Sequence, residues 1–547
     1  MLRRALPFLL LVLAIAPAAT FAWQFRDVPQ FGSAQDDAVY LESGKALSEG
    51  QGYRLPHLPE RPYATKYPPG YPALIAIIWR FAPEFPRNLQ WLVVVNLAAL
   101  AIMLAGAFRL FRLHGLSQEV AALLAVALGW LHPFTFLAVS ILTEIVFTAL
   151  LVWVFVALES IDARKWRFAA LGGAIAAAAY LTRASALPLL LSVPLCLAIR
   201  RRYLAVIAFA LTFAPVIGAW SLWRLHHPLG YHDYVSLFYL DYEGLERQSV
   251  GLDNILSVLT VNVDVMLTSI GEVFVFALGQ GSWWGRQAAR LIGIAAMLGA
   301  ARFAIRSRKY QYAVYGALYC LMMSVWHYPP GLRFFVPLVP LFVAGLWTEC
   351  AHVRQLIRQA WSSAKIENRI SAAAFAAGLA AFLMCMAYSA AAARFRDFPA
   401  VEEEARVRSA ELRRAFRQVA ALTPARAAIL SDQDVLLSLY TGRSSYRTIV
   451  SPRLFYPMRE DLVRAVFAGL PDGAGRRWDY ALVTRWDWLH TLSSADTPSL
   501  RKTIDAHPGL DPVWRSDFAV LYARREPGYR ALARTPTSTQ EASRPDR

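Results

Sequence analysis

Two adjacent carboxylates and a lysine stand near the beginning of the chain, in the segment QDDAVYLESGKALSEGQGYRLPHLPERPYATKYPPGYPAL. Asp36 and Asp37 are neighbours, and Tyr40 and Glu42 follow at a spacing that keeps one helical face. Lys66 leads into a Tyr-Pro-Pro-Gly turn, which cannot continue as a regular helix. A carboxylate can remove a proton and an ammonium group can bind a phosphate. This one segment therefore offers both a base and a phosphate-binding cation.

The composition indicates that this segment belongs to a membrane protein. The chain has 547 residues, of which 56% are hydrophobic and 17% are charged. Its apolar stretches repeatedly approach the roughly 20 residues that cross a bilayer as a helix. We therefore predict an α-helical polytopic membrane protein with about eleven transmembrane helices, near 6–23, 89–111, 119–139, 141–158, 168–182, 184–199, 203–222, 288–304, 310–327, 333–350 and 371–393.

The placement of arginine and lysine predicts the orientation of these helices, because short cytoplasmic loops collect positive charge. Every second connection is basic, at Arg3 and Arg4, Arg109 and Arg112, Arg164 to Arg167, Arg200 to Arg202, Arg302 to Lys309, and Arg354 to Arg369. The N-terminus is then cytoplasmic, and 24–88, 223–287 and everything after 394 lie on the opposite side. The net charge of +17 belongs mostly to this pattern and to a basic tail, so no nucleic-acid partner is predicted.

Two apolar stretches allow a second interpretation. Residues 254–281 are hydrophobic but contain Asp264 and Glu272, and a crossing there would invert every later loop against the charge rule. We expect an amphipathic helix that lies at the outer interface. The first apolar stretch, 6–23, has an alternative as a signal peptide, although it is longer than the usual apolar region of one.

The chain changes character after 394. Residues 394–420 mix arginine, glutamate and alanine, which predicts a solvated helix, and 426–430, 478–484 and 518–523 are short apolar runs typical of strands. We predict a transmembrane domain over 1–393 with a catalytic outer loop at 24–88 and a second outer loop at 223–287, a soluble α/β domain over 394–534, and a disordered tail over 535–547.

Three motifs of the first outer loop, DDAVYLE, GKALSEGQGY and TKYPPGYPALIA, resemble the GT-C membrane glycosyltransferases. This group includes lipid A aminoarabinose transferases and protein O-mannosyltransferases, and the resemblance is closest to its bacterial polyprenyl-phosphate-sugar branch. Asp36, Asp37 and Lys66 stand at the positions of the family's acid pair and lysine turn. Weaker matches are Thr143-Glu144, Thr182-Arg183, Arg333-Phe334-Phe335-Val336-Pro337 and Thr441-Gly442-Arg443. Thr65 stands where some relatives have Glu, so a further loop carboxylate is not carried over.

The resemblance implies a glycosyltransferase on the outer face of a bacterial inner membrane. Its donor would be a sugar on polyprenyl phosphate, and its acceptor a hydroxyl of a cell-envelope molecule: lipid A, a polysaccharide, a glycolipid or a protein. Asp36 would remove the acceptor proton and direct displacement would invert the anomeric carbon. The acid pair Asp36 and Asp37 forms the predicted catalytic group, and the predicted substrate-binding residues are Tyr40, Lys66, Tyr67, Glu144, Arg183 and Arg333.

Each of these residues has an alternative role. The acid pair would also suit a solvated helix start, because acids are favoured at helix N-termini. Asp37 either tunes the pKa of Asp36 or binds Mg²⁺ or Mn²⁺, the only cofactor that the sequence suggests. Lys66, Arg183 and Arg333 would also serve as interfacial anchors. Glu144 is either functional or a paired acid, since a free acid is costly inside a membrane.

Two other classes of function stay open. A secondary transporter would show related halves and polar groups at the middle of the bilayer, whereas the acids of this chain gather at the outer ends of spans. A non-catalytic flippase or scaffold for lipid-linked sugars is harder to distinguish from a glycosyltransferase, because a fold does not by itself give an activity. Such a scaffold would tolerate replacement of Asp36.

Overall fold

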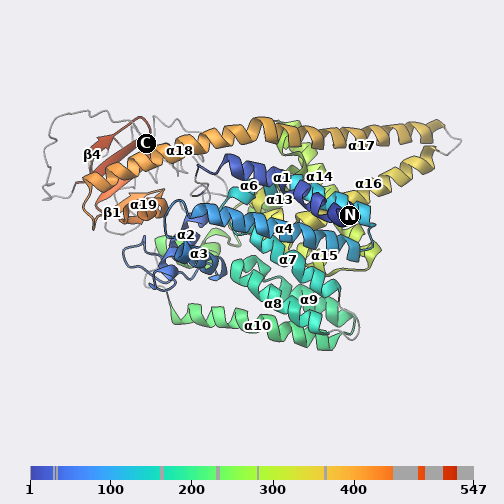
Figure 1. Cartoon of the computed structure of the whole chain (residues 1–547), viewed down its shortest axis with the longest axis horizontal. Helices are drawn as coiled ribbons and strands as arrows, with labels where there is room; N and C mark the ends of the chain where they lie inside the picture. Colours follow the sequence, from blue (N-terminus) through green and yellow to red (C-terminus); the bar gives the residue numbers. More distant parts are fainter. Residues whose placement is uncertain are drawn as a thin grey trace.

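The computed structural model describes residues 2–28, 31, 35–160, 166–228, 234–279, 282–361, 366–447, 478–486, 505 and 509–525. It shows a bundle of helices with a small sheet beyond one end (Figure 1). The bundle helices are α1 (Leu2–Gln24), α4 (Leu89–Leu113), α5 (Gln118–Trp130), α6 (His132–Val139), α7 (Glu144–Glu159), α8 (Trp166–Thr182), α9 (Leu189–Ile199), α10 (Tyr203–His226), α13 (Ile255–Gly279), α14 (Trp283–Ser307), α15 (Gln311–Ser324), α16 (Val339–Trp361) and α17 (Ile366–Ala392).

Shorter helices connect the bundle and lie toward the sheet. They are α2 (Asp36–Ser48), α3 (Gly70–Phe81), α11 (Tyr234–Leu240), α12 (Tyr242–Ser249) and the 3-10 helices η1 (Ala184–Ala186) and η2 (Leu332–Leu338). In Figure 1, α2 and α3 occupy the end of the bundle that is nearest to the sheet. The segment predicted as the first outer loop therefore lies between the long apolar helices and the C-terminal part of the chain.

Several bundle helices have the properties of membrane spans. Among the described residues, five helices are long and apolar enough to cross a membrane: α4, α10, α14, the first 22 residues of α13, and η2 continued by α16. The pair α5 and α6 meets the same criterion but is bent by 54°. Other predicted spans coincide with shorter helices, since α7, α8 and α15 have 16, 17 and 14 residues. The polytopic helical fold is confirmed in this coarse form, and the number of eleven crossings stays a prediction.

Three helix ends that adjoin basic connections lie close together. His114, after α4, contacts the Ser307 hydroxyl at the end of α14, with 2.9 Å from Nδ1 to Oγ. Lys309, after α14, pairs with Glu159 at the end of α7, with 3.4 Å between Nζ and Oε2. The ends of α4, α7 and α14 are therefore neighbours, as the charge pattern predicts for one side of a membrane.

α13 differs from the interfacial helix predicted over 254–281. It packs along α14, and Gly271 and Gly293 bring the two backbones so close that a side chain at either position would collide with a carbonyl group of the facing helix. Asp264, one of the acids behind that prediction, forms an ion pair with Arg290 of α14. The acid has a partner on the neighbouring helix, which hydropathy along a single segment does not reveal.

The C-terminal part forms a mixed sheet, which within the described residues has the strand order β2-β1-β3-β5-β4. β1 pairs in parallel with β2 and β3, while β5 pairs antiparallel with β3 and β4. The strands are β1 (Ala428–Ser431), β2 (Ser444–Tyr446), β3 (Tyr480–Thr484), β4 (Leu510–Arg515) and β5 (Ala519–Arg524). The helix α19 (Asp434–Thr441) connects β1 to β2.

The predicted elements of this part are largely confirmed. The runs 426–430, 478–484 and 518–523 correspond to β1, β3 and β5. The helix predicted over 394–420 corresponds to α18 (Phe398–Leu422), which continues α17 through the π-helical turn η3 (Ala393–Asp397). In Figure 1, α17 and α18 form one long rod that leads to the sheet. The tail predicted over 535–547 lies outside the described residues.

Candidate functional site

Asp36 opens α2, a helix that is buried on nearly all of its faces. Gly44, near the end of α2, packs directly against Ile75 of α3. The side chain of Asp36 is 25% exposed, whereas Asp37 is only 1% exposed. A solvated helix start is therefore excluded, because most of the first turn of α2 faces protein rather than water.

Groups from two distant segments hold the carboxylate of Asp36. Arg333, in η2, donates a hydrogen bond to Oδ2 at 3.0 Å, and the hydroxyl of Tyr67 donates to Oδ1 at 2.6 Å. The prolines that follow Tyr67 stop a helix from continuing through this turn, and the turn brings the tyrosine to the start of α2. The predicted base, the predicted arginine and the predicted tyrosine therefore meet at one carboxylate.

Lys66 lies beside this group. Its ammonium donates to the carbonyl oxygen of Phe238 at 2.7 Å, and its Nζ lies 4.6 Å from the centroid of the Phe238 ring and 5.1 Å from that of Tyr67. The ring of Tyr40 packs edge-on against Tyr67, with 5.0 Å between centroids. Since Phe238 belongs to α11, the predicted outer loop 223–287 covers the lysine turn.

Arg183 and Glu144 form a second ion pair near the same cations, with 2.9 Å between Nη1 and Oε1. Arg183 also donates to the hydroxyl of Thr143 at 2.9 Å. The guanidinium carbons of Arg183 and Arg333 lie 5.3 and 5.0 Å from the centroid of the Phe334 ring. Glu144 is fully buried and is therefore a paired acid, while Arg183 reaches into the protein instead of only anchoring a helix end.

The charges around the site set the protonation of Asp36 and Lys66. Burial alone would raise the pKa of Asp36, but the charges of Arg333 and Lys66 and the hydrogen bond from Tyr67 outweigh it and hold the pKa below its ordinary value. Burial lowers the pKa of Lys66 to about 8, against the charge of Asp36 and together with the charges of Arg447 and Arg333. At neutral pH the site therefore holds an ionised carboxylate and a protonated lysine that is close to losing its proton.

Asp37 is buried more deeply than its neighbour Asp36. Its Oδ1 accepts a hydrogen bond from the backbone N–H of Ala38 at 2.8 Å, within a buried environment. The part of the chain that the structure describes contains no group of three or more His, Cys, Asp or Glu residues able to hold a metal ion. The role of Asp37 as a metal ligand stays a prediction.

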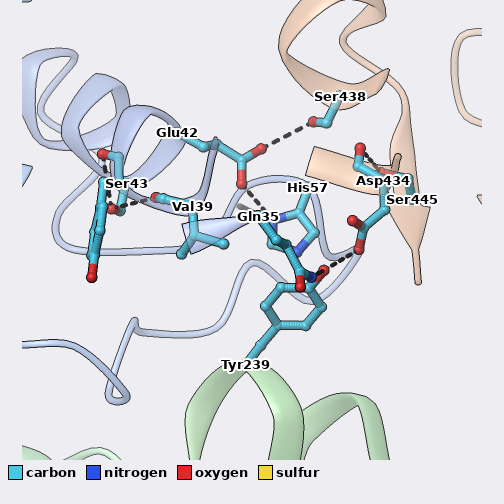
Figure 2. A network of polar contacts seen from close by, with 10 residues as sticks. Gln35, Val39, Glu42, Ser43, His57, Tyr239, Asp434, Ser438 and Ser445 are labelled. Carbon is cyan, nitrogen blue, oxygen red and sulfur yellow. Dashed lines mark hydrogen bonds and ion pairs between the residues drawn. The ribbon is translucent and has the colours of Figure 1, made fainter. Parts of the chain in front are cut away.

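A second buried network on α2 is absent from the predicted site (Figure 2). Glu42 pairs with His57, and the hydroxyl of Ser438 in α19 donates to Glu42 at 3.0 Å. Nearby, the hydroxyl of Tyr239 in α11 donates to Asp434 of α19. Glu42 belongs to the motif DDAVYLE, but its partner Ser438 follows almost 400 residues later, and no local pattern links them.

Comparisons with known proteins give matches in structure alone. No family model matches the sequence, and no curated protein matches it. ArnT from Cupriavidus metallidurans, a lipid A aminoarabinose transferase solved bound to undecaprenyl phosphate, is similar with a TM-score of 0.54 and 14% identity, over 94% of this chain and 97% of that chain. An Archaeoglobus fulgidus oligosaccharyltransferase, tethered with an acceptor peptide, matches with a TM-score of 0.52 and 12% identity, over 95% of this chain and 74% of that chain. Both are GT-C type enzymes.

The chain has the GT-C fold. This confirms the resemblance that the first outer loop predicts, since the similarity extends over nearly the whole chain. At 12–14% identity the similarity concerns architecture, and architecture alone does not assign an activity. The functional argument therefore depends on the residues that the GT-C fold brings together in this chain.

Proposed function

We propose that the chain is a membrane glycosyltransferase that moves a sugar from a polyprenyl-phosphate donor to a hydroxyl of a cell-envelope acceptor. The observation that carries this proposal is the ionised, partly exposed carboxylate of Asp36 beside the cations Arg333 and Lys66, with Arg183 on the same phenylalanine ring as Arg333. A base beside cations is what transfer from a phosphate donor requires.

The reaction is a direct displacement. Asp36 takes the proton of the acceptor hydroxyl, whose oxygen forms a bond to the anomeric carbon as the bond from that carbon to the phosphate oxygen breaks. The electron pair of the broken bond leaves with the phosphate, which is stable as an anion and needs no general acid. One displacement of this kind inverts the anomeric centre. Arg333 and Lys66 stabilise the charge that develops on the leaving phosphate.

Donor binding would also make Asp36 a better base. In the free protein, Arg333 and Lys66 are among the groups that hold the pKa of Asp36 low, which makes the carboxylate a weak proton acceptor. A bound phosphate brings negative charge to these cations and offsets their effect on Asp36, so the pKa of Asp36 rises. The base is thus strengthened once the donor is in place.

The similar structures support the class of donor. ArnT was solved with undecaprenyl phosphate, a polyprenyl phosphate, and its fold covers nearly the whole of this chain. We extend that class of lipid to this chain, with inversion at the sugar. The acceptor is proposed only as an envelope hydroxyl, on lipid A, a polysaccharide, a glycolipid or a protein.

The proposed setting is a bacterial inner membrane, with a cytoplasmic N-terminus and a periplasmic C-terminal domain. These orientations require an odd number of crossings, about eleven in total whether or not α13 is one of them. Labelling of single cysteines tests this topology after the four native cysteines are replaced. Gln51→Cys and Ala425→Cys should react with a membrane-impermeant maleimide in intact spheroplasts, and Arg201→Cys should not; all three positions are exposed. Protection of Ala425→Cys would place the C-terminal domain on the other side.

The activity is tested with purified protein in liposomes that contain a polyprenyl-phosphate sugar and envelope acceptors. Wild-type protein should release polyprenyl phosphate in step with the appearance of glycosylated product, and the product should have the inverted anomeric configuration. Asp36→Asn serves as the inactive variant, and Asp27→Asn, an exposed acid of the same outer loop, serves as its control. If wild type transfers no sugar and Asp36→Asn behaves like wild type, the alternative holds, which is a non-catalytic flippase, scaffold or transporter.

A further inference from the structure

The C-terminal domain contacts the helix that carries Asp36 through buried polar groups (Figure 2). Ser438 of α19 donates to Oε1 of Glu42 at 3.0 Å, and Glu42 pairs with His57. The backbone N–H of Ser445 in β2 donates to the carbonyl oxygen of His57 at 2.7 Å. Buried polar groups are costly without partners, so these contacts hold the domain in one place against α2.

The same domain also contacts the second outer loop. The hydroxyl of Tyr239 in α11 donates to Asp434, which is 1% exposed at the start of α19. The amide of Gln35, directly before α2, donates to the hydroxyl of Tyr239 at 2.8 Å. One set of hydrogen bonds therefore joins α2, α11 and α19. Phe238 directly precedes Tyr239 in the chain and lies beside this set.

The edge of the sheet places an arginine at this junction. Asp432 and Arg447 come directly after β1 and β2, and because these strands are parallel their carboxyl ends meet at one edge. Arg447 Nε lies 3.2 Å from Asp432 Oδ1, and the two side chains are 11% and 1% exposed. The guanidinium carbon of Arg447 lies 5.3 Å from the centroid of the Phe238 ring.

Phe238 is also the ring over which Lys66 lies, with 4.6 Å from Nζ to its centroid. Two cations from distant parts of the chain therefore share one aromatic ring. The charge of Arg447 contributes to the lowered pKa of Lys66, as expected for like charges that lie close together. A bound anion relieves this repulsion, and Lys66 is the cation assigned to the donor phosphate.

We propose that Arg447 binds the donor phosphate together with Lys66, so that the transfer site is complete only when the C-terminal domain is docked on α2 and α11. This inference rests on the proposed function, because the phosphate is that of the donor. A guanidinium presents a planar fork of donors that suits phosphate oxygens. The domain thus supplies part of the site in addition to any role in holding the acceptor.

The chemistry predicts when Arg447 acts most strongly. A polyprenyl-phosphate sugar is a phosphodiester with one negative charge, and the released phosphate is a monoester that can carry about two at pH 7. The electron pair from the broken carbon–oxygen bond goes to that phosphate. A cation beside it binds the leaving group more strongly than the donor, and this lowers the barrier. Loss of Arg447 should therefore reduce kcat more than it raises the donor KM.

The first test replaces Arg447 in the full-length protein. Arg447→Gln should lower kcat/KM for the donor by roughly tenfold to a hundredfold, and Arg447→Lys should recover part of the loss because it keeps the charge without the fork. The matched control is Arg443→Gln in the same domain. Arg443 donates to the carbonyl oxygens of Ala420, Thr423 and Thr441, so its loss should lower Tm and leave the donor kinetics unchanged.

A pH profile separates a binding role from a merely structural one. The charged or titratable groups near Lys66 include Asp36, Tyr67, Arg333, Arg447 and His327. Without Arg447 the pKa of Lys66 rises, so the alkaline limb of kcat/KM should move to higher pH in Arg447→Gln and stay in place in Arg443→Gln. Asp432→Asn keeps the arginine and should retain donor use within a fewfold, whereas a purely structural pair would make both variants equally defective.

Binding of undecaprenyl phosphate distinguishes the proposed function from the proposed role of Arg447. This binding is measured by the rise in Tm that the lipid causes. The rise should be large in wild type and Arg443→Gln and much smaller in Arg447→Gln. If the lipid raises Tm in wild type and Arg443→Gln but much less in Arg447→Gln, and wild type transfers no sugar, the proposed function fails while Arg447 remains a phosphate-binding residue. If wild type transfers sugar and Arg447→Gln matches it in lipid binding, kinetics and pH profile, the inference about Arg447 is wrong.

Discussion

α2 carries three acids, and two of them, Asp36 at its first residue and Glu42 near its middle, occupy different surroundings. Asp36 faces Arg333 and the hydroxyl of Tyr67, and a quarter of its side chain stays exposed. Glu42 is 3% exposed and is enclosed between His57 and Ser438. One acid can be reached by a reactant, while the other joins two parts of the protein. The comparison teaches that the same type of side chain on one helix serves chemistry or assembly according to what surrounds it.

The partners of the two acids also differ in how they hold charge. Arg333 keeps its charge at every accessible pH, so Asp36 always faces a cation. Burial lowers the pKa of His57, but Glu42 and Asp434 outweigh this effect and raise it above its ordinary value. The first pair is thus a permanent electrostatic environment, and the second depends on protonation of a buried histidine.

The largest expected effect is on the exposed acid. Asp36→Asn keeps the shape of the side chain but removes the proposed base, so transfer should fall by roughly a hundredfold or more while the protein stays folded and membrane-inserted. The measurement is initial rate with purified protein and a polyprenyl-phosphate sugar. Asp37→Asn is the neighbouring comparison, and its transfer rate should fall much less, because Asp37 is 1% exposed and a reactant cannot reach it. Activity of Asp36→Asn within a fewfold of wild type would remove Asp36 from the mechanism.

A smaller effect is expected from the cation that faces Asp36. Arg333→Ala should lower donor use by about tenfold to a hundredfold, since charge-assisted hydrogen bonds to phosphate contribute on the order of 1.5–3 kcal/mol. Arg333→Lys should restore part of the lost donor use, because the ammonium retains the charge but lacks the bidentate fork. Kinetics with donor and acceptor varied separately measure this, and a change confined to the acceptor term would assign Arg333 to the other substrate.

The pH dependence of donor use should report Lys66. Its pKa of about 8 means that the ammonium is present below this pH and is lost as the pH rises through it. Because the protonated form binds phosphate, kcat/KM for the donor should decline above about pH 8 in wild type. Lys66→Arg should remove this decline, since a guanidinium keeps its proton. An alkaline limb that stays near pH 8 in Lys66→Arg would assign it to another group.

The smallest effect on catalysis is expected from the enclosed acid. Glu42→Gln leaves a group that can still accept from Ser438 but removes the charge that faces His57. The free energy of unfolding should fall by about 1–3 kcal/mol, as for other buried polar groups that lose a partner. Thermal unfolding in detergent measures this loss, and transfer at a temperature where the variant is folded should stay within a fewfold of wild type. A catalytic defect as large as that of Asp36→Asn would erase the distinction between the two acids.

Part of this organisation could be predicted because it depends on local composition. Apolar segments of membrane length, basic connections on one side, and the acid pair, lysine turn and arginine of the site are each readable within a few residues. The contacts of Asp36 with Arg333 and Tyr67 agree with the set of residues predicted to act together. The strands at 426–430, 478–484 and 518–523 were also predicted, since a short apolar run between polar turns has few other structures available.

The sequence by itself therefore determined which segments meet the membrane and which side chains are available for chemistry. Only the tertiary structure decided which of them meet: the pairing of Asp264 with Arg290 that lets α13 pack inside the bundle, the pairing of Arg183 with Glu144, and the approach of Arg447 to the ring beside Lys66. The physical reason is that hydropathy and charge act through the nearest residues of the chain, whereas an ion pair or a ring contact depends on the packing of helices that are hundreds of residues apart.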